Sequence, residues 1–565
     1  MTEQKVPVAD ESSAYPKNGL LTNFIAGKRS ALALIVLIGI IVYSNTLHSP
    51  FIYDDYPNIV DNSEIKNLSS FFDGASLLKL RYLGRLSFAV NYHFSELNTF
   101  SYHVVNITIH LLAAILVYCL VLLTARTPLF RLSENTPRQS DFQVIALYAA
   151  LLFVAHPVQT QAVTYIIQRF ASLATMLYLL SLMSYIRGRL ELDSPVRTRT
   201  PFFLISFLAA AAAMESKETA LTLPFMIALY EFTFFRGPVL KRLGYICLIA
   251  ATSLIIPFQF IMTRLSSSSL LLTPGNLLTE NVSIPRDLYL YSQFGVITTY
   301  IRLIFLPINQ TIDYYHSQYA MMKFFQFGVI APLLLLISII ILAFYLHIRG
   351  VRRNQPLLCL IAFGVFWFFI ALSIESSIIP ISDLIFEHRV YLPSVGAFIA
   401  IATAAILLLG KLSRKRTIFS HAVPAVMVIS ITAYATATLA RNAVWKDDIS
   451  INMDNVKKTP LRGLAHNNLG YTYLMHGKYE QAAQEFRTAI DLEPVLAPAL
   501  VYNNLGLAMK KLYRYEEAIA AFKKASQKAP DNEVFRKNFK ITVAELDNLK
   551  KYFTNSGMQH NRLKR

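Results

Sequence analysis

Charged residues are scarce in this sequence. Asp, Glu, Lys and Arg together make up 16% of the 565 residues, whereas 54% are hydrophobic. A soluble domain carries about a quarter charged residues, so this shortage excludes an ordinary soluble globular protein. Apolar runs long enough for a helical membrane span, about 20 residues each, recur along the chain as far as residue 440. Clear examples are residues 31–47, 104–123, 327–346 and 357–372. The sequence therefore predicts an all-α, polytopic membrane helical bundle.

Cysteine is also scarce, and its positions exclude a disulfide framework. The chain has three cysteines, Cys119, Cys247 and Cys359, and each lies inside an apolar run. A disulfide set or a cysteine metal site needs paired or clustered cysteines. We therefore expect these three to be small core or lipid-facing side chains.

Acidic residues are outnumbered by basic ones. The 53 Lys and Arg against 35 Asp and Glu give a formal net charge of +18. Such an excess can indicate nucleic-acid binding, but here the basic residues lie in short loops between apolar runs, without a basic groove interleaved with aromatics. Membrane proteins concentrate Lys and Arg in cytoplasmic loops, so the excess indicates membrane topology and no nucleic-acid partner.

The loop charges predict how the chain is oriented. Lys28 and Arg29 precede the first apolar run, which has no clear small-residue cleavage site after it. We therefore expect a cytoplasmic tail at residues 1–30, followed by an uncleaved signal-anchor. The long polar loop 49–100 then lies outside.

One apolar segment does not fit this alternation. Residues 288–306 are interrupted by Arg302, and counting them as a full span would place all later basic loops outside. Treating them as a re-entrant or interfacial segment restores the expected sides. The result is a transmembrane domain at 31–440 with eleven spans plus this irregular segment. A C-terminal domain at 441–565 then lies on the non-cytoplasmic side.

The C-terminal domain contains an internal repeat. Seven residues recur at one constant offset of 36 positions: Leu469, Gly470, Tyr479, Ala482, Phe486, Ala489 and Pro494 return as Leu505, Gly506, Tyr515, Ala518, Phe522, Ala525 and Pro530. Tetratricopeptide units have a period of about 34 residues, with small residues where paired helices cross and a closing proline. We predict two units, at about 465–498 and 501–534, capped by flanking helices in an α-solenoid. Such a domain typically binds proteins.

Polar residues gather on the predicted outer face. Ionisable side chains beside apolar spans are costly and usually functional. Taken alone, each group fits a solvated loop or a helix end, but their agreement on one side predicts an outward-facing active site. The groups are Tyr53, Asp54 and Asp55; His156, Gln161, Gln168 and Arg169; Glu215, Ser216, Lys217 and Glu218; and Asp383, Glu387, His388 and Arg389.

Several motifs together resemble one family, the transmembrane-and-tetratricopeptide O-mannosyltransferases. The matching segments run through nearly the whole chain in order: 51–56 (FIYDDY) with Asn58 and Asn62, 84–87 (GRLS), 156–163 (HPVQTQAV), 217–218 (KE), 390–396 (VYLPSVG) and the C-terminal repeats. Leu86 stands where the family commonly has proline, and Gln161 where an acid is common. The chain also has only two evident repeats, whereas animal members carry long arrays, so a prokaryotic relative is expected.

The resemblance implies a GT-C glycosyltransferase fold and a reaction. A sugar, mannose or a similar one, would pass from a polyprenyl-phosphate donor to Ser or Thr of a protein. The expected location is the inner (plasma) membrane of a bacterium with the repeats in the periplasm, or the endoplasmic reticulum membrane in a eukaryote.

The expected site residues follow from motif position and from the chemistry. The acceptor hydroxyl needs a base, and a partly buried carboxylate suits this role; we expect Asp54, with Asp55 orienting it or sharing the task. Direct attack would invert the anomeric centre. The leaving phosphate needs positive charge, and Arg389 is the first candidate because guanidinium grips phosphate with two hydrogen bonds. Further phosphate-binding candidates are Arg169, Lys217, His388 and Arg85, and substrate or loop roles are expected for His156, Glu215, Glu218, Glu387 and Tyr391.

A bound metal and three alternative functions stay open from sequence alone. Asp54, Asp55, Glu215 and Glu218 are hard oxygen ligands suited to Mg²⁺ or Mn²⁺, but the resembled family is considered metal-independent, so no metal or cofactor is predicted. A non-catalytic scaffold would not need acids and bases on one face, and a transporter would typically show matching halves, which are not evident. Transfer to a lipid or polysaccharide acceptor is the third alternative.

Overall fold

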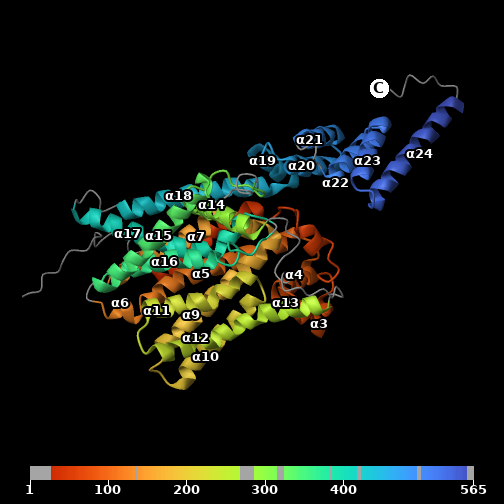
Figure 1. Ribbon diagram of the computed structural model, residues 1–565. Coiled ribbons are helices and arrows are strands. Elements are labelled where there is room, and N and C mark those ends of the chain that lie inside the picture. Colours follow the sequence, from red (N-terminus) through yellow and green to blue (C-terminus); the bar gives the residue numbers. More distant parts are fainter. Residues whose placement is uncertain are drawn as a thin grey trace, which may run out of the picture. The chain divides into compact units, whose positions relative to one another are not determined.

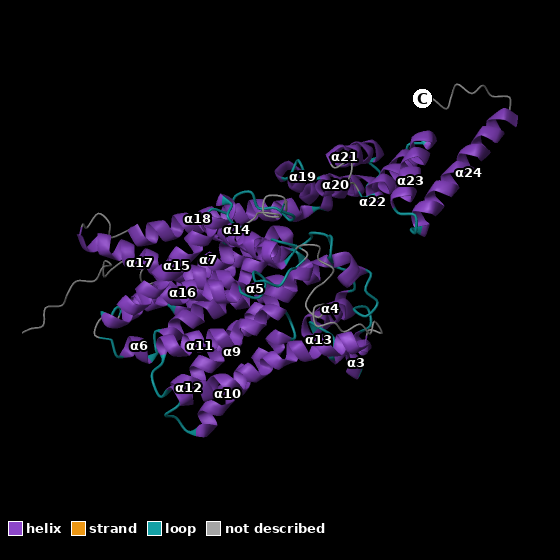
Figure 2. Cartoon of the chain, in the orientation of Figure 1, coloured by secondary structure: helices purple, strands orange, loops and turns teal. Residues whose placement is uncertain are grey.

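The computed structural model describes residues 27–133, 137–266, 285–314, 324–381, 383–415, 422–492 and 498–555. In this part of the chain the regular secondary structure is helical throughout (Figure 2). The chain divides into two compact units: a membrane unit, Met1–Gln310 with His316–Ala443, and a repeat unit, Thr311–Tyr315 with Val444–Arg565. Most of the predicted cytoplasmic tail at 1–30 and the repeat proline Pro494 lie outside the described residues. The prediction of an all-α protein is confirmed.

The membrane unit consists of long helices joined by short ones. The longer helices are α2 (Lys28–Tyr43), α4 (Tyr82–Ser95), α5 (Thr99–Thr124), α7 (Gln139–Ala155), α9 (Arg169–Leu190), α10 (Val196–Met214), α11 (Leu223–Phe234), α12 (Val239–Ala250), α13 (Ile255–Ser266), α14 (Arg286–Phe305), α15 (Phe327–Arg352), α16 (Pro356–Leu372), α17 (Tyr391–Lys415) and α18 (Ala422–Ala443). The short elements are η1 (Ser44–Thr46), η2 (Tyr56–Val60), η3 (Leu68–Phe71), α3 (Gly74–Leu77), α6 (Pro128–Arg131), η4 (Pro157–Gln159), α8 (Thr160–Thr164), η5 (Ile166–Gln168), η6 (Glu218–Thr222), η7 (Ala251–Leu254) and η9 (Glu387–Val390).

Burial separates core helices from lipid-facing ones. Helix α5 packs against α2, α7 and α9 within the bundle (Figure 1), and 61% of its apolar span is buried. Helix α15 is more apolar, with a mean hydropathy of 2.9, yet only 17% of its span is buried. An apolar helix that leaves most of its surface uncovered needs lipid around it. The membrane unit is therefore a polytopic integral membrane bundle.

The helices agree in position with the predicted spans. Among the described residues, seven helices are long and apolar enough to cross a membrane, and an eighth span forms if the bent pair Gln139–Ala155 and Pro157–Thr164 counts as one. The apolar run 357–372 is helical as α16, and the apolar segments 201–214 and 219–235 are helical as α10 and as η6 with α11. The irregular segment 288–306 forms the continuous helix α14 and is not among the seven. Whether the shorter helices also cross the membrane, giving eleven spans in total, stays a prediction.

A proline interrupts the helical segment that begins with α7. Helix α7 ends at Ala155, and Pro157 then starts the short helices η4 and α8 with a bend of 51°. Proline lacks the N–H that would continue the helix. The imidazole Nδ1 of His156 instead accepts the backbone N–H of Val158 at 3.1 Å and caps the new start. After the break, residues 157–168 form the short helices η4, α8 and η5, which are almost entirely buried.

The repeat unit stacks paired helices. After η11 (Val444–Lys446) come α19 (Asp448–Lys458), α20 (Gly463–Met475), α21 (Tyr479–Leu492), α22 (Ala499–Lys511), α23 (Tyr515–Lys528) and α24 (Glu533–Asn555). The repeated glycines lie where paired helices cross. A Cβ at Gly470 would approach Phe486 to 2.8 Å, and one at Gly506 would approach Phe522 to 2.7 Å. The offset of 36 therefore marks the same contact twice.

Candidate active site

The two adjacent acids lie in a tight turn after α2. The backbone N–H of Asp55 donates to the carbonyl of Ile52 at 2.9 Å, and Tyr53 has a left-handed φ of 43°. Non-glycine residues adopt positive φ infrequently and at a cost, so the surrounding contacts must hold this turn. The turn points the two neighbouring carboxylates into different surroundings.

Asp55 is buried and anchors the turn. One carboxylate oxygen accepts the backbone N–H of Ile52 at 3.0 Å, and the other accepts that of Ile167 at 2.8 Å. Burial raises the pKa of Asp55 to about 8, although these two hydrogen bonds and nearby Arg169 act in the opposite direction. With both oxygens held by the backbone, Asp55 is suited to positioning its neighbour rather than to meeting a substrate.

Asp54 has an exposed side chain beside polar partners. Its backbone N–H donates to the hydroxyl of Tyr165 at 2.8 Å. Partial desolvation raises the pKa of the Asp54 carboxyl, the nearby carboxylate of Asp383 raises it further, and a hydrogen bond with Tyr165 opposes both. An accessible carboxylate with a raised pKa is a candidate general base.

Arg389 lies on η9 between aromatic and acidic neighbours. Its guanidinium donates to the carbonyl of Leu384 at 3.2 Å. It also lies over the ring of Phe386, 5.4 Å from the ring centroid. Its electrostatic neighbours include Glu375 and Asp383, besides the hydroxyls of Tyr289 and Tyr300. Asp383 therefore interacts electrostatically with both Asp54 and Arg389.

Lys217 extends the same network from the loop after α10. Its ammonium forms a buried ion pair with Glu375 at 2.9 Å. Burial lowers the pKa of Lys217, while Glu375 acts to raise it. One ion pair and longer-range electrostatic interactions thus link Asp54, Asp383, Arg389, Glu375 and Lys217. We call these five residues the ion cluster.

Two further predicted site residues, His388 and Glu218, interact electrostatically with Lys217 of the ion cluster. His388 is an electrostatic neighbour of Lys217 and Arg389, and its backbone N–H donates to the carboxamide of Gln161 at 2.8 Å. Glu218 forms a two-pronged ion pair with Arg81, with its shortest contact at 2.9 Å. These contacts join η9 to α8, and η6 to the residue before α4.

Several other predicted site residues are already bonded within the protein. The buried guanidinium of Arg169 donates to Asn106 at 2.6 Å, to Asn91 at 2.8 Å, and to the carbonyls of Ser87 and Tyr102 at 3.1 Å each. Such a set of partners joins α4, α5 and α9. The same atoms are therefore not available to hold a phosphate without breaking this packing.

His156 and Tyr391 belong to the core of the bundle. Besides capping η4, His156 donates from Nε2 to the carbonyl of Ile304 at 2.9 Å. The hydroxyl of Tyr391 is hydrogen-bonded to Nδ1 of His110 at 2.7 Å, and both side chains are buried. Their contacts support helix packing.

The remaining three predicted residues have local partners. Arg85 pairs with Glu64 in the loop before α4 and lies over the ring of Phe71. Glu215 accepts a hydrogen bond from Gln259 at 2.6 Å, and burial raises its pKa. Glu387 accepts from the carboxamide of Gln310 at 2.8 Å. Among the described residues, no group of three or more His, Cys, Asp or Glu side chains is arranged to hold a metal ion.

Sequence reasoning passed over four contributors to this site. Glu375 follows α16 among small polar residues, and Tyr165, Tyr289 and Arg81 carry no motif of their own. In the sequence, Asp383 is only one of several acids on the predicted outer face. In the sequence, Glu375 is recognisable only as a lone acid after an apolar run. This position does not reveal its partner Lys217 in a distant loop.

These observations define a class of protein. It is an all-helical, polytopic membrane protein with an ion cluster assembled from loops at one end of its bundle, and it carries a tetratricopeptide unit. The repeat prediction is confirmed, because the family model described as Tetratricopeptide repeat matches residues 463–494 and 499–532.

Comparison with known proteins identifies the homologues. The chain is 26% identical over 509 residues to protein O-mannosyl-transferase TMTC3 of Mus musculus, covering 82% of this chain and 51% of the relative. It is 24% identical over 478 residues to protein O-mannosyl-transferase F38B6.6 of Caenorhabditis elegans, covering 82% and 63%. These relatives are protein O-mannosyl-transferases, and the resemblance that the motifs predicted is confirmed. The chain spans only about half to three fifths of the length of these relatives.

A solved structure is also similar. ArnT from Cupriavidus metallidurans, in a crystal structure bound to undecaprenyl phosphate, aligns over 89% of this chain and 81% of its own. The sequence identity is 12% and the TM-score is 0.38.

Proposed function

We propose that this protein is a membrane glycosyltransferase with a GT-C-like bundle. It moves a sugar, mannose or a similar one, from a polyprenyl-phosphate donor to Ser or Thr of a protein on the non-cytoplasmic face. The observation that carries the proposal is the ion cluster, which joins an accessible acid to two buried cations from separate loops. A scaffold would have no need to bury such charges. The names of the homologues support the same reaction class.

The proposed reaction is a direct displacement. The Asp54 carboxylate accepts the proton of the acceptor hydroxyl, whose oxygen attacks the anomeric carbon. The bond from that carbon to the phosphate oxygen breaks, and the lipid phosphate leaves with the electron pair. Attack opposite the leaving group inverts the anomeric centre. Asp55 positions Asp54 through its two backbone hydrogen bonds.

Arg389 and Lys217 are suited to receive the leaving phosphate. Both are buried; Lys217 forms an ion pair with Glu375, and Arg389 interacts electrostatically with Glu375 and Asp383. Preorganised cations in a desolvated site stabilise developing negative charge far more than they would in water. The arriving phosphate would compete with Glu375 and Asp383 for these cations.

The acceptor is proposed to be a protein because of the repeat unit. Tetratricopeptide repeats typically bind peptides or proteins. The donor, the sugar and the protein acceptor are all part of this proposal, and one transfer assay tests them.

The test is a transfer assay with purified full-length protein. Polyprenyl-phosphate mannose and a Ser/Thr peptide are incubated with wild type, Asp54→Asn and the control Asp61→Asn, whose exposed acid lies in the same outer loop. Removing a general base lowers the rate by about 10²- to 10⁴-fold, so we expect this loss only in Asp54→Asn. Mass analysis of the peptide reports the added sugar.

Three results would contradict the proposal. Equal transfer by Asp54→Asn and wild type would remove Asp54 as the base. Sugar on an added lipid acceptor but not on peptide would replace the protein acceptor. No new covalent product from any lipid-linked sugar, with folded protein, would favour the scaffold.

A further inference from the structure

A basic pocket lies at the end of the bundle opposite the ion cluster. Three cations contribute to its lining: Lys28 at the start of α2, Arg126 just after α5, and Arg131 at the end of α6. Asp54 instead follows the other end of α2. The pocket has a volume of about 490 Å³ and is completed by Leu122, Ala125, Pro137, Gln139, Phe142 and Gln143.

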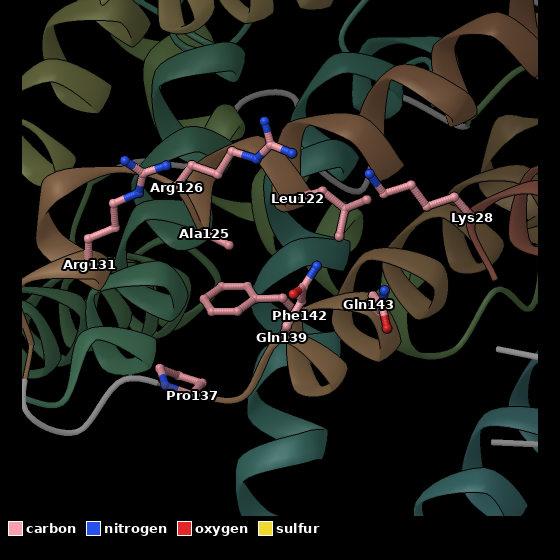
Figure 3. Close-up of a pocket in the computed structure, with 9 residues that line it drawn as sticks. All are labelled: Lys28, Leu122, Ala125, Arg126, Arg131, Pro137, Gln139, Phe142 and Gln143. Atoms are coloured by element: carbon pink, nitrogen blue, oxygen red, sulfur yellow. The ribbon is translucent and has the colours of Figure 1, made fainter. Parts of the chain in front are cut away.

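The lining combines charge with apolar surface. Figure 3 shows Arg131, Arg126 and Lys28 along one rim, with Phe142 and the carboxamides of Gln139 and Gln143 below them. No acid is among the described residues that line the pocket. Among the described residues, none of the three cations forms an ion pair with a carboxylate, whereas Arg189 and Arg242 at neighbouring helix ends share buried Glu231. In the described part of the chain, the pocket thus gathers three cations that have no carboxylate partner.

We infer that this pocket binds the phosphate headgroup of an anionic phospholipid. Guanidinium and ammonium groups bind phosphate oxygens, and basic pockets between helix ends are suited to anionic headgroups. The apolar residues Leu122 and Phe142 lie on α5 and α7, where a glycerol backbone and the first acyl carbons can pack. A free phosphate ion would meet the cations but would leave this apolar part of the pocket unfilled. The lipid is thus the better fit, and this site is separate from the proposed glycosyl transfer.

The test uses purified full-length protein and native mass spectrometry. Phosphatidylglycerol and phosphatidylcholine with identical acyl chains are titrated, so that only the net charge of the headgroup differs. The pocket variant is Lys28→Gln with Arg126→Gln and Arg131→Gln. The matched control is Arg197→Gln with Arg352→Gln and Arg353→Gln, which removes the same charge from exposed positions outside the pocket.

We expect wild type to retain phosphatidylglycerol in preference to phosphatidylcholine. The pocket variant should lose about a hundredfold in affinity, since each basic residue near an anionic headgroup contributes about 1 kcal/mol. The control variant should bind as wild type does. A charge-retaining variant, Lys28→Arg with Arg126→Lys and Arg131→Lys, should keep the preference and verifies that the pocket tolerates substitution.

Distinct outcomes overturn the inference. Equal losses in the pocket and control variants would mean that only overall interfacial charge matters. Equal binding of the two lipids by wild type would exclude an anionic-headgroup site. Binding of inorganic phosphate that displaces phosphatidylglycerol at equal concentration would assign the pocket to a soluble anion. If the triple variant fails to fold, the single variant Arg131→Gln must still weaken binding, by about fivefold.

Discussion

At the residue scale, two neighbouring acids have different environments. Asp55 is buried with both oxygens bonded to backbone N–H groups, whereas the side chain of Asp54 is exposed. The pair was predictable as a site from its position after an apolar run. Which acid anchors and which faces outward was not predictable, because Ile167 and Tyr165 are more than 100 positions away in the sequence.

Asp383 provides a pH test of this arrangement. Its carboxylate raises the pKa of Asp54, so Asp383→Asn should lower that pKa. A base with a lower pKa stays deprotonated in more acidic solution. We therefore expect the acid limb of the pH profile of kcat/KM to move to lower pH. An unchanged limb, with activity retained, would mean that Asp54 does not control this limb.

Arg389 provides a test of charge geometry. Arg389→Lys keeps the positive charge but loses the planar pair of donors that grips a phosphate. We expect kcat to fall by about 10²-fold, while Arg352→Lys, at an exposed position, leaves it unchanged. The steady-state rate with saturating donor is the measurement. Equal rates for both variants would argue against a phosphate contact at Arg389.

Arg169, His156 and Tyr391 show why polar residues are hard to assign from sequence. His156 and Tyr391 lie in motifs of the resembled family and Arg169 follows one of them, yet their polar atoms bond to neighbouring helices. A polar side chain in an apolar bundle needs partners whether it is functional or structural. The sequence shows the residue but not the partner, so the two roles look alike.

At the element scale, glycines set how closely helices approach. Helices α16 and α17 pack where Gly364 faces Gly396: a Cβ at Gly364 would lie 2.3 Å from the carbonyl oxygen of Gly396. That oxygen is backbone and cannot rotate away. The contact brings α17, and with it η9 and Arg389, against α16.

Gly364→Ala should therefore destabilise the bundle. We expect a loss of about 1–3 kcal/mol, measured as a lower unfolding temperature in detergent. Gly244→Ala on α12 is the matched control, because nothing lies within 4 Å of a Cβ there. Alanine favours a helix over glycine by about 1 kcal/mol, so the control should be neutral or slightly stabilised. Equal unfolding temperatures for the two variants would contradict the close approach.

At the scale of the whole molecule, topology can be tested directly. In a background with Cys119, Cys247 and Cys359 replaced by alanine, single cysteines are placed at exposed Asp61, Asp531 and Arg352. The proposed topology puts the outer loop and the repeats on one side and the end of α15 on the other. An impermeant maleimide added to sealed cells should label positions 61 and 531 but not 352. Labelling of 61 and 531 from opposite sides would contradict it.

The sequence by itself determined the helical class, the membrane spans and the repeat. These depend on local properties, namely the length of apolar runs, the sign of loop charges and a constant offset of 36 residues. The motifs also predicted the resemblance to protein O-mannosyl-transferases, to one of which the chain is 26% identical over 82% of its length.

Only the tertiary structure decided which polar side chains act together. The ion cluster joins residues from the loops after α2, after α10 and after α16 with one on η9. The same packing occupied Arg169 with four internal hydrogen bonds. Electrostatic and hydrogen-bond energies depend on distance in space, and positions along a chain do not determine that distance until the helices have packed.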